Sequence, residues 1–503
     1  MTPRQGVALA LISAFIAVVI LDLPTAQRWL DAGKDWLVND FNLFFVGLAS
    51  LCVPVALWIG LDPRFNVRLG ADNETPAFGR LSWFAMLFSA GLASGMIYWA
   101  TAEPLTHFQA NPHLHGAAPL TYAAGVSAIT LTVLHWGLHG WAFYVLAGLG
   151  IALACYRDQQ PLALRSALWP LLGERTHGPL GITVDLIGVL GTVFGVATSV
   201  GLAVAGMNAA LANLFGIDNS ISVQLGIVAL VVLLGLGSVL SGVSQGIRRL
   251  SVANLVLSLV LMIAVLLIAP TFDVLAMVLA VAGEYLLQSL PMAAWSASTA
   301  ADLQWQGDWT VFYWGWWLAW TPFVGLFVAR ISRGRTVREF VLAVLLVPTV
   351  VVIVWMSIFG GAALQYELAG ASGGSLLDVV NADYSVGTTA LIEGMNVLVV
   401  PLTALIAVLL FSWLITSLDS ATLVICHLLE GDAHRLPGAS VSPGAWSKVL
   451  WSVLLGGVTA ALMLIGGVGA LQSASIVVGL PVGLVLILVI VALVRGLLTR
   501  HRV

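Results

Sequence analysis

The chain is poor in charged residues. Asp, Glu, Lys and Arg make up only 9% of its 503 residues, whereas apolar residues make up 60%. A soluble domain carries about 25% charged residues. This deficit excludes a soluble fold, because so much apolar surface requires lipid as its solvent. The net charge of −4 is too small for this length to indicate a nucleic acid or an acidic partner.

Cysteine is also scarce. The three cysteines, Cys52, Cys155 and Cys426, are far apart and lie in or beside apolar segments. Their spacing excludes both a disulfide framework and a zinc-binding motif. We expect them to be small buried hydrophobic residues.

Long apolar runs dominate the chain instead. A helix needs about 20 apolar residues to cross a bilayer. Runs of that length fall near residues 7–24, 41–61, 81–101, 120–153, 181–213, 222–242, 249–270, 309–330, 338–360, 396–425, 446–468 and 472–496. They predict about twelve transmembrane helices. Residues 272–295 are also apolar but include Glu284 and are flanked by acids, so we expect an interfacial helix there.

The basic residues support this count. With twelve spans and a cytoplasmic N-terminus, all 20 Lys and Arg residues except Arg28 and Lys34 lie on the cytoplasmic side. This asymmetry follows the positive-inside rule, and a thirteenth span would destroy it. The first apolar run lacks a small-residue cleavage site, so we expect it to be retained as a helix. The sequence thus predicts a multi-pass protein of the inner (plasma) membrane with both termini in the cytoplasm.

The third span carries Gly91 and Gly95 near its centre. Glycines four residues apart allow another helix to approach closely, which is one interpretation. The other is an unwound segment whose carbonyls hold an ion and whose free amides hold a carboxylate. The sequence leaves both open.

Two spans carry aromatic clusters. In the fourth span, a continuous helix places Trp136, Trp141 and Tyr144 on one side. His135 and His139 are spaced for a zinc ion, but no third ligand is evident, and ordinary polar contacts are favoured.

In the eighth span, Trp317 and Trp320 lie near the bilayer centre, too deep for an interfacial belt. Pro322, just beyond them, predicts a discontinuity in the helix.

Aromatic side chains at one depth on two helices can form a cage for a methylated ammonium group. Ring faces bind such a cation with about 2 kcal/mol or more per desolvated contact. No Asp or Glu is adjacent to either cluster in the sequence. A zwitterion, which brings its own carboxylate, is therefore favoured over a permanent cation.

Hydroxyl groups in two spans suggest a sodium ion. Thr416 and Ser417 lie about ten residues from the inner end of the tenth span, and Thr192, Thr198 and Ser199 lie in the fifth. Hydroxyl and carbonyl oxygens are suitable sodium ligands. The alternative is that these hydroxyls donate to carbonyls of their own helices.

At these segments the chain resembles the betaine/choline/carnitine transporter family. The resemblance rests on Glu103-Pro104-Leu105, His135-Trp136-Gly137-Leu138-His139, Tyr313-Trp314-Gly315-Trp316-Trp317 and the run from Ala329 to Thr336. It implies an all-α polytopic membrane protein of about 12 transmembrane helices, with two inverted five-helix (LeuT-like) repeats. The implied single domain, 1–503, comprises two additional N-terminal helices (1–80), a first repeat (81–270), an outer interfacial helix and loop (271–308) and a second repeat (309–496).

The resemblance also implies site residues. The substrate site would comprise Trp136, Trp141, Tyr144, Trp317 and Trp320, and we add Gly91 and Gly95 from the third span. One Na⁺ site maps onto Ser89, Leu92, Trp413, Thr416 and Ser417, and a second onto Thr192 and Phe323. Val196 stands where some sodium-coupled members have a threonine, which weakens the second site.

The implied function is Na⁺-coupled symport and not enzymatic catalysis. We expect import of a zwitterionic onium solute, glycine betaine first, with dimethylsulfoniopropionate, ectoine or carnitine next, by a homotrimer. The alternative is a proton-coupled choline transporter. A channel or a membrane enzyme is disfavoured, because the sequence shows no filter-like loop and no mid-membrane cluster of acid, base and nucleophile.

Overall fold

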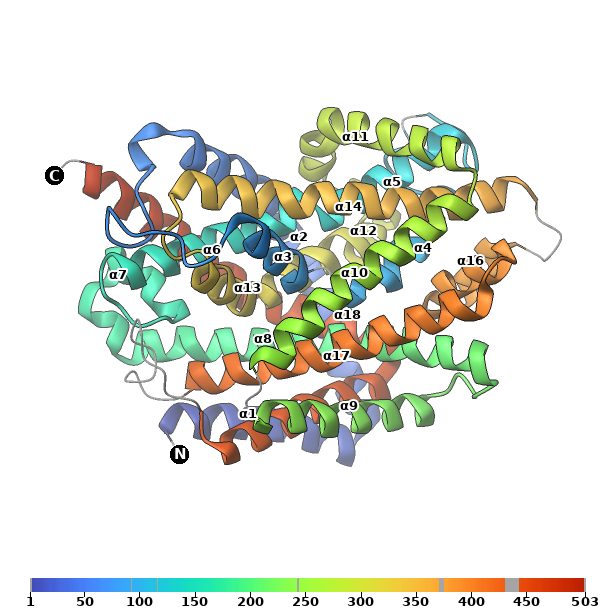
Figure 1. The fold of residues 1–503 in the computed structure, drawn as a ribbon. Coiled ribbons are helices and arrows are strands. Elements are labelled where there is room, and N and C mark those ends of the chain that lie inside the picture. The colour runs from blue at the N-terminus through green and yellow to red at the C-terminus, as the bar shows by residue number, and fades with distance from the viewer. Residues whose placement is uncertain are drawn as a thin grey trace.

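The computed structural model describes residues 2–91, 93–114, 116–241, 244–370, 375–429 and 443–501. Within these ranges the regular structure is helical apart from one isolated β-bridge (Figure 1). The helices are α1 (Pro3–Leu21), α2 (Leu23–Leu61), α3 (Arg80–Gly91), α4 (Ala93–Gln109), α5 (Tyr122–Trp136), α6 (Leu138–Tyr156), α7 (Trp169–Leu172), α8 (Pro179–Phe215), α9 (Ile221–Ser241), α10 (Ser244–Ile268), α11 (Thr271–Ala294), α12 (Ala300–Gln306), α13 (Phe312–Ile331), α14 (Val337–Leu368), α15 (Leu376–Ala382), α16 (Gly387–Met395), α17 (Val399–Leu429) and α18 (Ala445–His501).

The twelve predicted spans all fall on helices, and ten described helices are long and apolar enough to cross a membrane. Helix α18 contains two predicted spans, because the backbone at Gly466 and Gly467 is not helical. The expected all-α polytopic membrane protein is confirmed. Helix α11 also has the length and composition of a span, so its interfacial placement stays a prediction. The three cysteines are buried, as expected.

Two helices differ from the sequence prediction. Helix α2 begins at Leu23 and not near residue 41, because Asp22 accepts a hydrogen bond from the Thr25 amide (3.1 Å) and starts the helix there. Hydropathy detects only the apolar second half of α2. The discontinuity predicted at Pro322 is wrong, because α13 continues through this residue. A membrane helix tolerates the one lost backbone hydrogen bond when neighbouring helices surround it.

Contacts between the two predicted repeats occur in corresponding pairs. Helix α6 packs on α13, and α14 packs on α4; α8 packs on α18, and α17 packs on α10. In the predicted repeats, α4 corresponds to α13, α6 to α14, α8 to α17 and α10 to the second half of α18. The contact of α6 with α13 therefore corresponds to that of α14 with α4, and the contact of α8 with α18 corresponds to that of α17 with α10. Such reciprocal pairing is what an inverted repeat produces.

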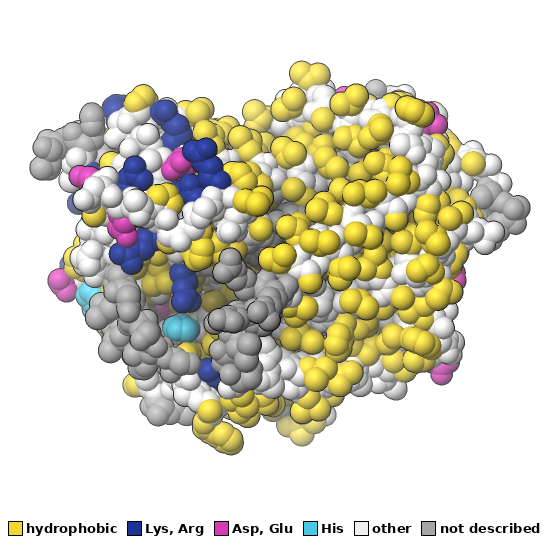
Figure 2. All heavy atoms as spheres, in the orientation of Figure 1, with side chains coloured by type: hydrophobic (Ala, Val, Ile, Leu, Met, Phe, Trp, Pro, Cys, Tyr) yellow, Lys and Arg dark blue, Asp and Glu magenta, His cyan; other side chains and the backbone are white. Residues whose placement is uncertain are grey.

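The loops before α3 and after α13 are joined by backbone hydrogen bonds. The Leu69 amide donates to the Arg335 carbonyl and the Gly334 amide donates to the Leu69 carbonyl, both at 2.7 Å. Gly334 has φ +81°, and a Cβ atom there would lie 2.3 Å from the Thr75 carbonyl oxygen, so only glycine fits. The Arg335 guanidinium stacks 4.6 Å from the Trp83 ring centroid. Basic side chains gather around these loops, at the same end of the molecule as both termini (Figures 1 and 2).

Helices α13 and α18 touch through their backbones at two glycines. A Cβ atom on Gly479 would lie 2.7 Å from the Gly315 Cα, and one on Gly315 would lie 2.8 Å from the Ile476 Cα. Small residues allow membrane helices to approach this closely. The close contact fixes α13, which carries the tryptophan-rich segment, against α18.

We expect Gly479→Ala to lower the melting temperature of the purified protein, since overpacking typically costs about 1–3 kcal/mol and the crowded atoms here are backbone. Gly226→Ala on α9 is the matched control, because nothing lies within 4 Å of a Cβ atom there. Thermal unfolding in detergent measures both. Equal melting temperatures for the two variants would show that the backbone contact is not tight.

Candidate functional site

The fourth predicted span is broken at Gly137, between α5 and α6. Gly137 has φ −95° and ψ −133°, outside the helical region. A Cβ atom there would lie 2.7 Å from both the Val133 carbonyl oxygen and the Tyr285 hydroxyl. The expectation that Trp136, Trp141 and Tyr144 share one continuous helix is therefore wrong. Hydropathy and helical periodicity do not detect a single non-helical residue inside an apolar run.

Side chains from two other helices bond to the backbone on either side of this break. The Leu138 amide donates to the Tyr285 hydroxyl of α11 (3.0 Å), and the Trp317 indole of α13 donates to the His135 carbonyl (2.7 Å). Buried backbone groups need such partners. The break is thus held open by α11 and α13.

Four of the five predicted aromatic residues form one continuous group. Ring centroids lie 5.6 Å apart for Trp136 and Trp317, 5.6 Å for Tyr144 and Trp317, and 5.5 Å for Trp141 and Tyr144. All three pairs meet edge to face, and all four side chains are buried. We call Trp136, Trp141, Tyr144 and Trp317 the aromatic cluster. It joins the consecutive helices α5 and α6 to α13, which is distant from them in the sequence.

Trp320 and Trp316 lie differently from what the sequence suggests. The Trp320 ring packs against Phe323, with centroids 5.4 Å apart, and has no ring contact with the aromatic cluster among the described residues. Trp316, which sequence reasoning missed, lies 5.7 Å from Trp136 and is stacked 6.1 Å from Trp317. Its signal was present in the Trp-Gly-Trp-Trp motif.

Two glycines allow the tryptophan rings to lie against helix backbones. A Cβ atom on Gly95 would lie 2.6 Å from the Trp136 ring, and one on Gly140 would lie 2.7 Å from the Trp317 ring. Gly95 was predicted to contribute to the site, and Gly140 was not. Leu92 lies outside the described residues, as do the side-chain surroundings of Ser89 and Gly91, so the predictions for these three residues stay predictions.

A buried carboxylate lies directly beside the aromatic cluster. Glu103 Oε2 accepts hydrogen bonds from the Trp136 indole (2.9 Å) and the Tyr313 hydroxyl (2.5 Å), and Oε1 lies 2.6 Å from His135 Nδ1. The expectation that no acid accompanies the aromatic rings is wrong. Glu103 is distant from them in the sequence, and the packing of α4 against α5 brings it there.

Glu103, His107 and His135 place ligand-type atoms within 4.8 Å of one another, as a metal site would. His139 is not part of this group, because its ring packs against Trp314 beyond the break. However, ligands about 2.0–2.1 Å from a tetrahedral zinc lie roughly 3.3 Å apart. The 2.6 Å between His135 and Glu103 is a hydrogen bond. The geometry favours a hydrogen-bond network over a metal centre.

Two of the hydroxyls proposed for sodium bond to their own helices. Thr416 donates to the Trp413 carbonyl (3.1 Å) and Thr192 to the Gly188 carbonyl (2.8 Å). A hydroxyl that donates keeps its acceptor lone pairs, so these contacts are compatible with both sequence interpretations. Phe323, the other residue of the second predicted ion site, is buried on α13, which packs against α8.

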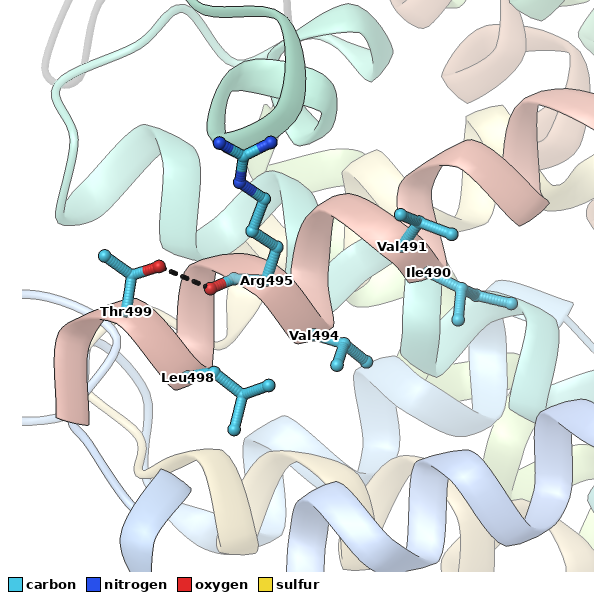
Figure 3. A pocket seen from close by; sticks show the side chains of 6 residues that line it. All are labelled: Ile490, Val491, Val494, Arg495, Leu498 and Thr499. Carbon is cyan, nitrogen blue, oxygen red and sulfur yellow. Dashed lines mark hydrogen bonds between the residues drawn. The ribbon is translucent and has the colours of Figure 1, made fainter. Parts of the chain in front are cut away.

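An open groove of about 580 Å³ lies on the last turns of α18 (Figure 3). It is lined by Ile490, Val491, Val494, Arg495, Leu498 and Thr499. It has no aromatic lining and lies on a different helix from the aromatic cluster. We therefore place the candidate solute site at the aromatic cluster and not in this groove.

The chain is similar to known transporters over nearly its whole length. The family model described as "BCCT, betaine/carnitine/choline family transporter" matches residues 5–502. The glycine betaine transporter of Acinetobacter baylyi is 34% identical over 97% of this chain and 72% of its own length. The high-affinity choline transport protein of Escherichia coli is 34% identical over 97% and 70%. The glycine betaine transporter OpuD of Bacillus subtilis is 34% identical over 99% and 94%.

A family match over nearly the whole chain, supported by relatives of this similarity, shows what kind of protein it is: a membrane transporter and not an enzyme, belonging to the betaine/carnitine/choline transporter family.

Proposed function

We propose that this protein imports a zwitterionic onium solute, glycine betaine before dimethylsulfoniopropionate, ectoine or carnitine. The observation that supports this most directly is the aromatic cluster, whose four buried rings come from three helices. A methylated ammonium group has no N–H to donate, so ring faces are its natural partners. Two of the relatives named above are glycine betaine transporters.

Choline is the second candidate solute, and a specific contact favours it. Glu103 supplies a buried carboxylate next to Trp136, and a negative charge near the rings suits a solute that carries only a positive charge. The choline transport protein of Escherichia coli is equally similar to this chain. Proton-coupled choline uptake is therefore the alternative to sodium-coupled betaine uptake.

We propose Na⁺ as the coupling ion and alternating access as the mechanism. One site would use Trp413, Thr416 and Ser417 with the carbonyls of Ser89 and Leu92, and another Thr192 with Phe323. One packing contact supports the second assignment: α8, which carries Thr192, lies against α13, which carries Phe323. The aromatic cluster joins helices of both predicted repeats, so a bound solute would couple their movement.

We also propose that both termini are cytoplasmic, that the protein resides in the plasma membrane and that it assembles as a homotrimer. The orientation is supported by the basic side chains that gather at the end carrying both termini (Figure 2). The trimer rests on the family resemblance.

We expect Trp317→Leu to weaken binding of glycine betaine by roughly 30-fold, the factor that corresponds to about 2 kcal/mol of cation–π attraction. Tryptophan fluorescence with a panel of betaine, choline, carnitine, dimethylsulfoniopropionate and ectoine measures this. Trp446→Leu is the matched control, because Trp446 is 79% exposed on α18. Unchanged affinity in Trp317→Leu would remove the aromatic cluster as the solute site.

We expect uptake into proteoliposomes to require a sodium gradient at fixed pH, and Thr416→Ala to raise the sodium concentration needed for half-maximal uptake by about tenfold, because it removes one ion ligand. Thr183→Ala is the control, since that exposed threonine makes the same type of bond to its own helix, at Pro179 (3.1 Å). Uptake that is independent of sodium and is abolished by a protonophore would instead support the proton-coupled alternative.

A further inference from the structure

The polar edge of each ring in the aromatic cluster has a different environment. The Trp317 indole donates to a neutral carbonyl, that of His135. The Trp141 indole and the Tyr144 hydroxyl have no hydrogen-bond partner among the described residues. Only the Trp136 indole donates to a carboxylate, that of Glu103. Trp136 is therefore distinguished from the rest of the cluster by an anion at its N–H.

Glu103 has the surroundings of an ionised carboxylate. An indole N–H can only donate, and Trp136 and Tyr313 both approach Oε2, while His135 approaches Oε1. These three partners come from α5 and α13 and surround a side chain that is 0% exposed. Hydrogen bonds to a charged acceptor are about twice as strong as neutral ones, and water does not screen them at this depth.

An anion at the N–H changes the face of the indole ring. Hydrogen-bond partners polarise one another in a medium of low dielectric, so a carboxylate that pulls on the N–H proton pushes electron density into the ring. A cation over the ring is attracted by the negative potential of that face. The Trp136 face is thus made more attractive to a positive charge, whereas its attraction for a neutral group of the same shape is unchanged.

We propose that Glu103 is a specificity-determining, positioning residue that acts through Trp136: it strengthens the binding of a charged onium head without touching the solute. This rests on the proposed function of the aromatic cluster. The competing explanation is that Glu103 only ties α4 to α5 and α13. The two differ in what they predict for solutes of equal shape and different charge.

The test compares each onium solute with its carbon analogue, in which the nitrogen is replaced by carbon. The pairs are glycine betaine with 3,3-dimethylbutanoate and choline with 3,3-dimethylbutan-1-ol, measured by equilibrium binding to the full chain in nanodiscs. In Glu103→Gln, we expect the ratio of onium to analogue affinity to fall by about tenfold, equivalent to roughly 1.4 kcal/mol. The affinity of the analogue should change by less than about twofold. Glu393→Gln, the same chemical change at an exposed outer residue, should leave the ratio unaltered.

A second variant isolates the N–H itself. Replacement of Trp136 by benzothienylalanine keeps a bicyclic ring but removes the donor, so it should lower the ratio by a similar factor. In that background, Glu103→Gln should cause no further decrease, because two residues that act through one contact are not additive. If Glu103→Gln fails to fold, the onium-to-analogue affinity ratio of the benzothienylalanine variant alone tests the inference.

An unchanged ratio, or a parallel loss of onium and analogue, would overturn the inference and leave Glu103 with a purely structural role. A wild-type protein that binds neither betaine nor choline would instead overturn the proposed function. The two failures are therefore distinguishable.

Discussion

In the interior of a membrane protein, every backbone group released from a helix has to find a partner within the protein. The candidate site depends on this constraint at Gly137. The break in the helix exposes the His135 carbonyl and the Leu138 amide, and the Trp317 indole and the Tyr285 hydroxyl bond to them. Trp317 thus has two tasks: its N–H stabilises the break, and its ring forms the centre of the aromatic cluster.

The carboxylate of Glu103 is subject to a related constraint. A buried charge is costly unless hydrogen-bond donors surround it, and here the donors are supplied by helices on both sides of the site. The polar network and the aromatic cluster share Trp136. Two residues of α4 therefore fix the position of this ring: Gly95 contacts it and Glu103 accepts its hydrogen bond.

The sequence predicts the spans and four of the rings that meet, but it also assigns Trp320 to them and misses Trp316. Apolar runs report spans because lipid requires them, and Trp136, Trp141, Tyr144 and Trp317 could be assigned from motifs. The break at Gly137, the polar first half of α2 and the position of Glu103 were missed for a common reason. Each depends on a partner that is distant in the chain or on a single backbone angle, and neither local composition nor periodicity records such contacts. Pro322 shows the reverse error, since its local effect was overridden by packing.

The contact between Gly315 and Gly479 has a consequence for how the site can open. No side chain separates α13 from α18 at this point. Helix α13 therefore cannot move closer to α18. Any widening around Trp317 must come from displacement of the segments on the opposite side, around the Gly137 break, or from α13 and α18 travelling together as one rigid pair.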